Sequence, residues 1–139
     1  MNGSGLTQRQ GWGITVLRVV VGIVFLVHGG QKLFVFGFGG VANFLGQVGI
    51  PAPMLAAVVV TAVEFLGGLA LLLGLFTRLA AIPLAINMLV AILTVHLKAG
   101  FFLPNGYEFA LTLLAATVAL VLLGSGEASV DRALEKRRA

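Results

Sequence analysis

The stretch PMLAAVVVTAVEFLGGLALLLGLF, residues 53–76, contains a single charged side chain, that of Glu64. A bilayer core about 30 Å thick needs about 20 mostly apolar residues in a helix, so this stretch predicts a transmembrane helix. Pro53 is well placed in the first turn of that helix, where the missing N–H leaves no bond unmade. Glu64 would then lie near the middle of the membrane, roughly 17 Å from one end of the helix.

Three further apolar stretches flank this helix. They predict helices over Trp12–Phe34, Arg78–Leu97 and Tyr107–Leu123. The second and third helices, and the third and fourth, are joined by short connections, so consecutive helices should pack side by side in opposite directions. The predicted fold is therefore all-α, an antiparallel four-helix bundle integral to the membrane.

The composition favours a membrane protein and excludes several other classes. Hydrophobic residues make up 59% of the chain and charged residues 10%, whereas about 25% of a soluble domain is charged. The net charge of +4 does not indicate nucleic-acid binding, because the cations lie at chain ends and turns rather than on one helix face. The absence of cysteine excludes thiol redox chemistry, disulfides and iron–sulfur clusters within this chain.

The long connection between the first two helices, Val35–Ala52, is not polar. Val41, Phe44, Leu45 and Val48 recur at helical spacing. We therefore expect a short amphipathic helix that lies on, or dips into, one membrane face, with a plain packing loop as the alternative. The chain is expected to divide into a transmembrane domain, residues 1–126, and a charged tail, residues 127–139.

The distribution of lysine and arginine predicts the orientation in the membrane. With four spans, both termini share a side with the turn between the second and third helices. Six cations lie on that side, namely Arg9, Arg78, Arg132, Lys136, Arg137 and Arg138. Only Lys32 and Lys98 lie on the other, so a multi-pass protein of the bacterial inner membrane with both termini in the cytoplasm is expected.

Ionisable residues inside a membrane are costly and therefore candidates for function. Arg18 and Glu64 are the two deepest opposite charges. We expect them to form a structural ion pair between the first two helices. The alternatives are that Glu64 holds a proton or a polar ligand group, or that it is neutral. Gly22, Gly67, Gly68 and Gly74, placed within the predicted helices, should allow close approach of helix backbones.

A second group of ionisable residues falls at one depth near the opposite end of the bundle. It comprises His28, Lys32, His96 and Glu108, with Glu64 deeper on the same side. Such a group could bind a polar head group and exchange protons with it. The alternative is that Lys32 and Glu108 anchor the helices at the interface and the histidines are merely packed. No metal site is expected, because paired ligand spacings are missing, and Asn87 is expected to form an interhelical hydrogen bond.

Taken in order, these residues resemble the DoxX family of small four-helix membrane proteins over roughly residues 17–131. The resemblance rests on an ordered set of motifs: Arg18, Phe25-xx-His28-Gly29-xx-Lys32, Gly49-Ile50-Pro51, Glu64-xx-Gly67-Gly68-xxxxx-Gly74-xxx-Arg78, Met88, His96, Gly100-Phe101-Phe102, Gly106-Tyr107-Glu108, and a terminal Gly-x-Gly followed by Ser129 and Asp131. It implies a four-helix integral membrane fold and a link to quinone-related or oxidative-stress functions.

The function expected from this resemblance is that of a membrane component of an oxidoreductase system that interacts with quinone. Electrons would come from a soluble or membrane redox partner, because the chain has no motif for flavin, haem or an iron–sulfur cluster. A quinone-like head group would bind near His28 and His96, with the 41–48 segment as a lid and Phe25, Phe44 and Phe101 around its apolar part. The alternatives are a small proton-linked transporter, using an Arg18–Glu64–His28 relay and forming a homo-oligomer, or a non-catalytic scaffold for soluble partners.

Overall fold

The computed structural model of the chain describes residues 7–139, and all regular structure within them is helical. The main helices are α1 (Gln8–Gln31), α2 (Gly37–Gln47), α3 (Pro53–Leu73), α4 (Thr77–Ala91), α5 (Glu108–Leu123) and α6 (Val130–Arg138). A π-helical segment, Lys32–Phe36, joins α1 to α2, and a second one, Ile92–His96, extends α4 before a short 3₁₀ turn at Leu97–Ala99. The prediction of an all-α protein is confirmed.

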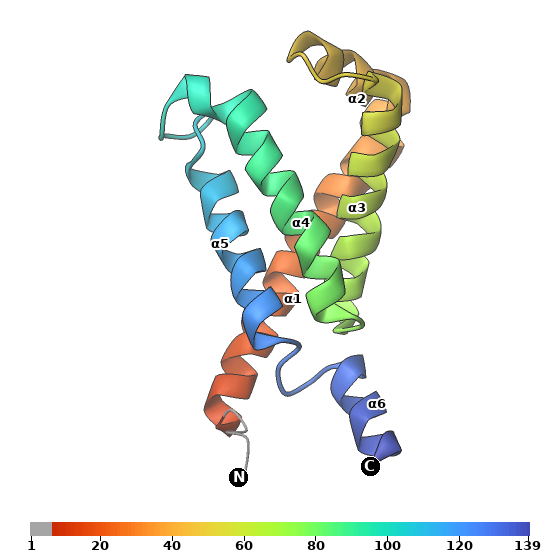
Figure 1. Cartoon of the computed structure of the whole chain (residues 1–139), viewed down its shortest axis with the longest axis vertical. Coiled ribbons are helices and arrows are strands. Elements are labelled where there is room, and N and C mark those ends of the chain that lie inside the picture. The colour runs from red at the N-terminus through yellow and green to blue at the C-terminus, as the bar shows by residue number, and fades with distance from the viewer. Residues whose placement is uncertain (1–6) are drawn as a thin grey trace.

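The four longest helices run alternately up and down the molecule, with α2 at one end and α6 at the other (Figure 1). Helix α1 packs chiefly on α3, and α4 chiefly on α5. Toward the α2 end, the α4–α5 pair diverges from α3 (Figure 1). A mostly apolar cavity lies at this end of the molecule, lined by α1, α2, α3, α4 and α5.

Three continuous helical segments are long and apolar enough to cross a membrane: Gln8–Gln47, Pro53–Leu73 and Thr77–Ala99. The fourth apolar helix, Glu108–Leu123, has 16 residues and is shorter. The expected amphipathic helix between the first two spans is present as α2, which packs against α3 through Val41, Ala42 and Ala57. One end of α2 continues from α1 through the π-helical segment, and residues 48–52 join its other end to α3. Both ends of α2 are therefore attached to the bundle.

Glycines set the register between α1 and α3. A Cβ atom added at Gly22 or Gly29 would collide with the α3 backbone near Leu72 and Phe65, and one added at Gly68 would collide with Leu26 of α1. The two backbones therefore approach as closely as small residues permit. Gly74 differs from its predicted place inside a helix, because it ends α3 with a positive φ of 69° that favours glycine.

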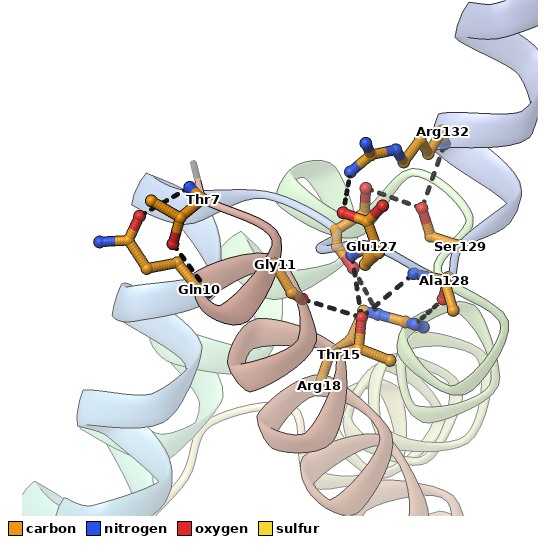
Figure 2. Close-up of polar contacts among 10 residues, drawn as sticks. Thr7, Gln10, Gly11, Thr15, Arg18, Glu127, Ala128, Ser129 and Arg132 are labelled. Atoms are coloured by element: carbon orange, nitrogen blue, oxygen red, sulfur yellow. Dashed lines mark hydrogen bonds and ion pairs between the residues drawn. The ribbon is translucent and has the colours of Figure 1, made fainter. Parts of the chain in front are cut away.

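The chain after α5 is bonded to the end of the bundle where α1 begins (Figure 2). The Glu127 N–H donates to the Gly11 carbonyl at 3.0 Å and lies 2.9 Å from Oγ1 of Thr15. Asp131 accepts hydrogen bonds from the backbone N–H groups of Phe76 and Thr77, and thereby caps the start of α4. The charged tail contains the helix α6, and its first residues are attached to α1 and α4.

Candidate functional site

The cavity at the α2 end has a volume of about 510 Å³ and is lined by residues from all four long helices and from α2. Most of the lining is apolar, with aromatic side chains from Phe25, Phe44 and Phe109. The polar side chains that reach it are those of His28, Lys32, Glu64, Asn87, Thr94 and His96. Volumes of about 300–1,000 Å³ with few polar groups are typical of small-molecule sites.

Three of these residues form a connected group, which we call the polar cluster: Lys32, Glu64 and Asn87. Lys32 Nζ lies 2.6 Å from Oε2 of Glu64, and Asn87 Nδ2 donates to Oε1 of the same carboxylate at 2.9 Å. Glu64 is only 5% exposed, so its charge is compensated by one cation and one amide rather than by water. The polar cluster thus joins α3 to α4 and to the end of α1.

Lys32 and His96 each belong to a π-helical segment, Lys32 at the start of one and His96 at the end of the other. A π-helical turn contains an extra residue relative to the α-helix and changes the direction in which the following side chains point, and such turns occur frequently at functional sites. Both π-helical segments of the described chain therefore contribute a cationic or titratable residue to the same cavity.

The two histidines have one ring nitrogen each in a defined hydrogen bond. Nδ1 of His28 lies 2.8 Å from the Val24 carbonyl oxygen, and Nδ1 of His96 lies 2.9 Å from that of Asn105. Because a carbonyl oxygen only accepts, each Nδ1 must carry the hydrogen. In the neutral ring Nε2 is then left as the acceptor, so either imidazole could take a proton from a ligand in the cavity.

The predicted group at the far end of the bundle is brought together only in part. His28, Lys32, His96 and Glu64 line the same cavity, but Glu108 does not. Its Oε2 accepts from the backbone N–H of Leu103 at 3.3 Å, within the connection that leads into α5. Glu108 begins α5 and bonds its own loop, so it is not part of the cavity.

The predicted ion pair between Arg18 and Glu64 is wrong. Arg18 is 1% exposed, and its guanidinium donates to four backbone carbonyls, those of Leu71, Leu72, Ser125 and Ala128. Leu71 and Leu72 lie about two helical turns, roughly 11 Å, along α3 from Glu64. Arg18 compensates the carbonyls at the end of α3, where a cation also interacts favourably with the helix dipole, and holds the tail there (Figure 2).

The helix register explains why Lys32 rather than Arg18 reaches Glu64. From the sequence alone, the start of the first helix and the end of the second are expected at the same depth in the membrane. In the structure, Gly29 of α1 lies against Phe65 of α3, which places Lys32, three residues further on, about one turn from Glu64. The sequence feature that indicates this register is the seven-residue spacing of Gly22 and Gly29, which places both on one face of α1. That face is where α1 approaches α3 most closely.

Asn87 lines the cavity, although the sequence indicated only an interhelical hydrogen bond for it. Its predicted interhelical hydrogen bond is confirmed, and the partner is Glu64. A lone amide in an apolar helix indicates a polar partner, but not which one.

In residues 7–139 no three His, Asp or Glu side chains gather closely enough to hold a metal ion.

Comparison with known proteins agrees with this architecture. The model of the DoxX family matches residues 13–97. A Bacillus subtilis protein with the name "Putative oxidoreductase CatD" is 39% identical over 119 residues, covering 86% of this chain and 84% of the relative. The membrane protein Rv3486 of Mycobacterium tuberculosis is 36% identical, covering 89% and 82% of the two chains.

A further relative is the inner membrane protein YqjF of Escherichia coli. It is 30% identical, with 90% of this chain and 94% of the relative covered. No solved structure is significantly similar to the chain. The family match, these relatives and the long apolar helices together identify the chain as a multi-pass inner-membrane protein that belongs to the DoxX family.

Proposed function

We propose that this protein binds a quinone-type ligand in the cavity and serves as a membrane component of an oxidoreductase system. The observation that carries the proposal is the polar cluster at the wall of an otherwise apolar cavity, with two imidazoles nearby. A quinone has a flat polar head and an apolar tail, and this cavity offers matching surfaces for both. The name of the CatD relative supports an oxidoreductase role.

The residues of the cavity have distinct parts in this function. Lys32 retains N–H groups beyond the one bonded to Glu64 and favours the anionic form of a reduced ligand. His28 and His96 are the groups that exchange protons with the ligand. The apolar part of the ligand contacts Phe25 and Phe44, both of which line the cavity, whereas Phe101 does not.

The chain contributes binding and proton exchange, and a partner contributes the electrons. Reduction of a quinone to a hydroquinone takes two electrons and two protons. The chain contains no cysteine and no motif for flavin, haem or an iron–sulfur cluster, so the electron donor in this proposal is a separate soluble or membrane redox subunit. Glu64, hydrogen-bonded to Lys32 and Asn87, limits the cavity at its inner side.

The proposed topology has four spans, with α5 as the fourth and both termini in the cytoplasm. The 16 residues of α5 extend about 24 Å, somewhat less than the bilayer core. Phe101, Phe102 and Leu103, in the preceding connection, are apolar and exposed, and would complete the span. The six-to-two distribution of cations supports the orientation.

The test is binding of a short-chain quinone to purified protein, measured by fluorescence quenching or calorimetry. Lys32→Gln, His28→Ala and His96→Ala should each weaken binding by about tenfold, because each removes one polar contact to the head group. Lys98→Gln, whose side chain is exposed and outside the cavity, is the matched control and should bind like the unmodified protein. Equal affinity in all variants, or no binding to any, contradicts the proposal.

The two alternative functions are a proton-linked transporter and a scaffold for soluble partners. A proton relay through Arg18, Glu64 and His28 would need Arg18 beside Glu64, and Arg18 instead bonds carbonyls at the far end of α3. No contact of Arg18 therefore favours the transporter.

Deletion of residues 133–139 distinguishes the proposed function from that of a scaffold that recruits partners through the tail. Quinone binding in the cavity should survive this deletion, whereas recruitment through the tail should not.

A further inference from the structure

A second cavity lies at the opposite end of the molecule, where α6 meets the beginning of α4 and the end of α5. It is a groove of about 900 Å³, which we call the basic groove. Four cationic side chains line it, those of Arg78, Arg132, Lys136 and Arg138. None of them lines the cavity at the α2 end, so the basic groove is separate from the proposed quinone site.

The lining of the basic groove carries more positive than negative charge, with four cationic and two acidic side chains. Of its two acidic residues, Asp131 is engaged by the backbone N–H groups that begin α4. Arg132 is paired with Glu127. Within residues 7–139, Arg78, Lys136 and Arg138 form no side-chain hydrogen bond or ion pair, which leaves three cations against the carboxylates of Asp131 and Glu135. A groove with this balance attracts an anionic group.

Arg78 is positioned in the groove by the backbone next to it. A Cβ atom added at Gly124 would lie 3.3 Å from Nε and 3.4 Å from Nη2 of Arg78. Gly124 has a positive φ of 86°, which favours glycine at this position. The guanidinium therefore lies against the turn that follows α5, at the end of the groove where the apolar helices begin.

The groove is bordered by apolar side chains that a membrane would contact. Phe76 and Leu79, at the start of α4, line the groove and are 62% and 69% exposed. Leu123 of α5 and Leu134 of α6 line it as well. The groove thus combines cationic side chains with exposed apolar side chains, which match the two parts of a phospholipid at the membrane surface.

We propose that the basic groove binds the phosphate head group of an anionic glycerophospholipid, with Arg78, Lys136 and Arg138 as its ligands. The acyl chains of the lipid contact the apolar side chains of α4 and α5. Basic pockets beside transmembrane helices bind acidic lipid head groups for the same electrostatic reason. The bound lipid would also fix α6 at the membrane surface and so strengthen the attachment of the tail.

The experiment titrates delipidated, full-length protein in neutral detergent with phosphatidylglycerol and counts bound lipids by native mass spectrometry. Phosphatidylcholine with the same acyl chains tests the need for net negative charge. A triple variant, Arg78→Gln/Lys136→Gln/Arg138→Gln, removes the ligands. A matched triple variant, Arg9→Gln/Lys98→Gln/Arg137→Gln, removes the same charge from residues that do not line the groove.

The unmodified protein and the matched control should prefer phosphatidylglycerol over phosphatidylcholine. The groove variant should bind phosphatidylglycerol at least about tenfold more weakly than the control, because attraction to an anionic lipid surface increases with each Lys or Arg. Equal loss in both triple variants would overturn the proposal, because it would show a general charge effect. Equal binding of the two lipids would overturn it as well.

Two further arms complete the test. Full displacement of the lipid by millimolar inorganic phosphate would contradict a lipid site and indicate a site for soluble anions. Circular dichroism reports whether the groove variant folds. If it does not, Lys136→Gln is compared with Arg137→Gln, since both are exposed on α6 and only Lys136 lines the groove. Weaker phosphatidylglycerol binding by Lys136→Gln alone supports the proposal, and equal binding contradicts it.

Discussion

The ammonium group of Lys32 lies 2.6 Å from the carboxylate of Glu64, and this contact joins the end of α1 to the middle of α3. The side chain of Glu64 is 6% exposed and that of Lys32 is 23% exposed. The pair thus has one buried member and one that reaches the cavity. A ligand that contacts Lys32 would therefore change the environment of the buried carboxylate directly.

We expect Lys32 and Glu64 to be energetically coupled. Lys32→Met leaves a buried carboxylate without its cation and should lower the free energy of unfolding by about 3 kcal/mol. The double variant Lys32→Met/Glu64→Leu should cost less than the sum of the two single variants. Denaturant unfolding in detergent provides the double-mutant cycle. The matched cycle between Arg18→Met and Glu64→Leu should be additive within about 0.5 kcal/mol, and strong coupling there would support the rejected ion pair.

Arg18→Lys should release the C-terminal tail. Lysine retains the charge, but its single ammonium group cannot reproduce the fork that donates to carbonyls of both α3 and the 125–128 segment. We expect a loss of about 2 kcal/mol in stability and faster tryptic cleavage within α6. The control is Arg9→Lys, on the exposed first turn of α1. Unchanged cleavage of α6 in Arg18→Lys would show that the tail is held by other contacts.

Two glycine-to-alanine substitutions should have opposite effects. At Gly68 the added methyl group collides with the backbone of Leu26, so Gly68→Ala should cost about 1–3 kcal/mol as α1 and α3 separate. At Gly13 no atom lies within 4 Å, so Gly13→Ala should be neutral or stabilising by up to about 1 kcal/mol. Melting temperatures of the two variants provide the comparison, and similar values would argue against a register set by glycine.

Asp131→Ala should destabilise the junction of α4 with the tail. The carboxylate accepts hydrogen bonds from Phe76 and Thr77, at 2.7 and 3.0 Å. Loss of such a cap costs about 1 kcal/mol. Hydrogen exchange at the first turn of α4 should rise in this variant. Glu135→Ala, which removes an exposed carboxylate from the same helix, should leave that exchange unchanged, and an equal rise in both would remove the capping role.

The proposed topology predicts opposite signals from two reporter fusions. A fusion after Arg78 should report the cytoplasm, and one within residues 101–105 the other side of the membrane, because the cations gather on the side of the termini. A pair of reporters that are active on opposite sides, such as alkaline phosphatase and a fluorescent protein, provides the measurement. A cytoplasmic signal from the 101–105 site would reverse the orientation.

The sequence by itself determined the helices of this protein. The apolar runs around residues 12–34, 53–76, 78–97 and 107–123 predicted α1, α3, α4 and α5 within a few residues, because helix formation in an apolar environment depends on local hydrophobicity and on every backbone group being bonded within its own segment. The helical stripe of Val41, Phe44 and Leu45 likewise predicted α2, and three of these helical segments are long enough to cross a membrane.

Only the tertiary structure decided which polar groups meet. The partner of Glu64 depends on the register between α1 and α3, and that register is set by the contacts of Gly22, Gly29 and Gly68 with the opposite backbone. A different register between the two helices changes no hydropathy pattern, yet it decides whether Lys32 or Arg18 lies beside Glu64. Residue depth along one helix is local information, whereas the contact between two side chains is a property of how two helices pack.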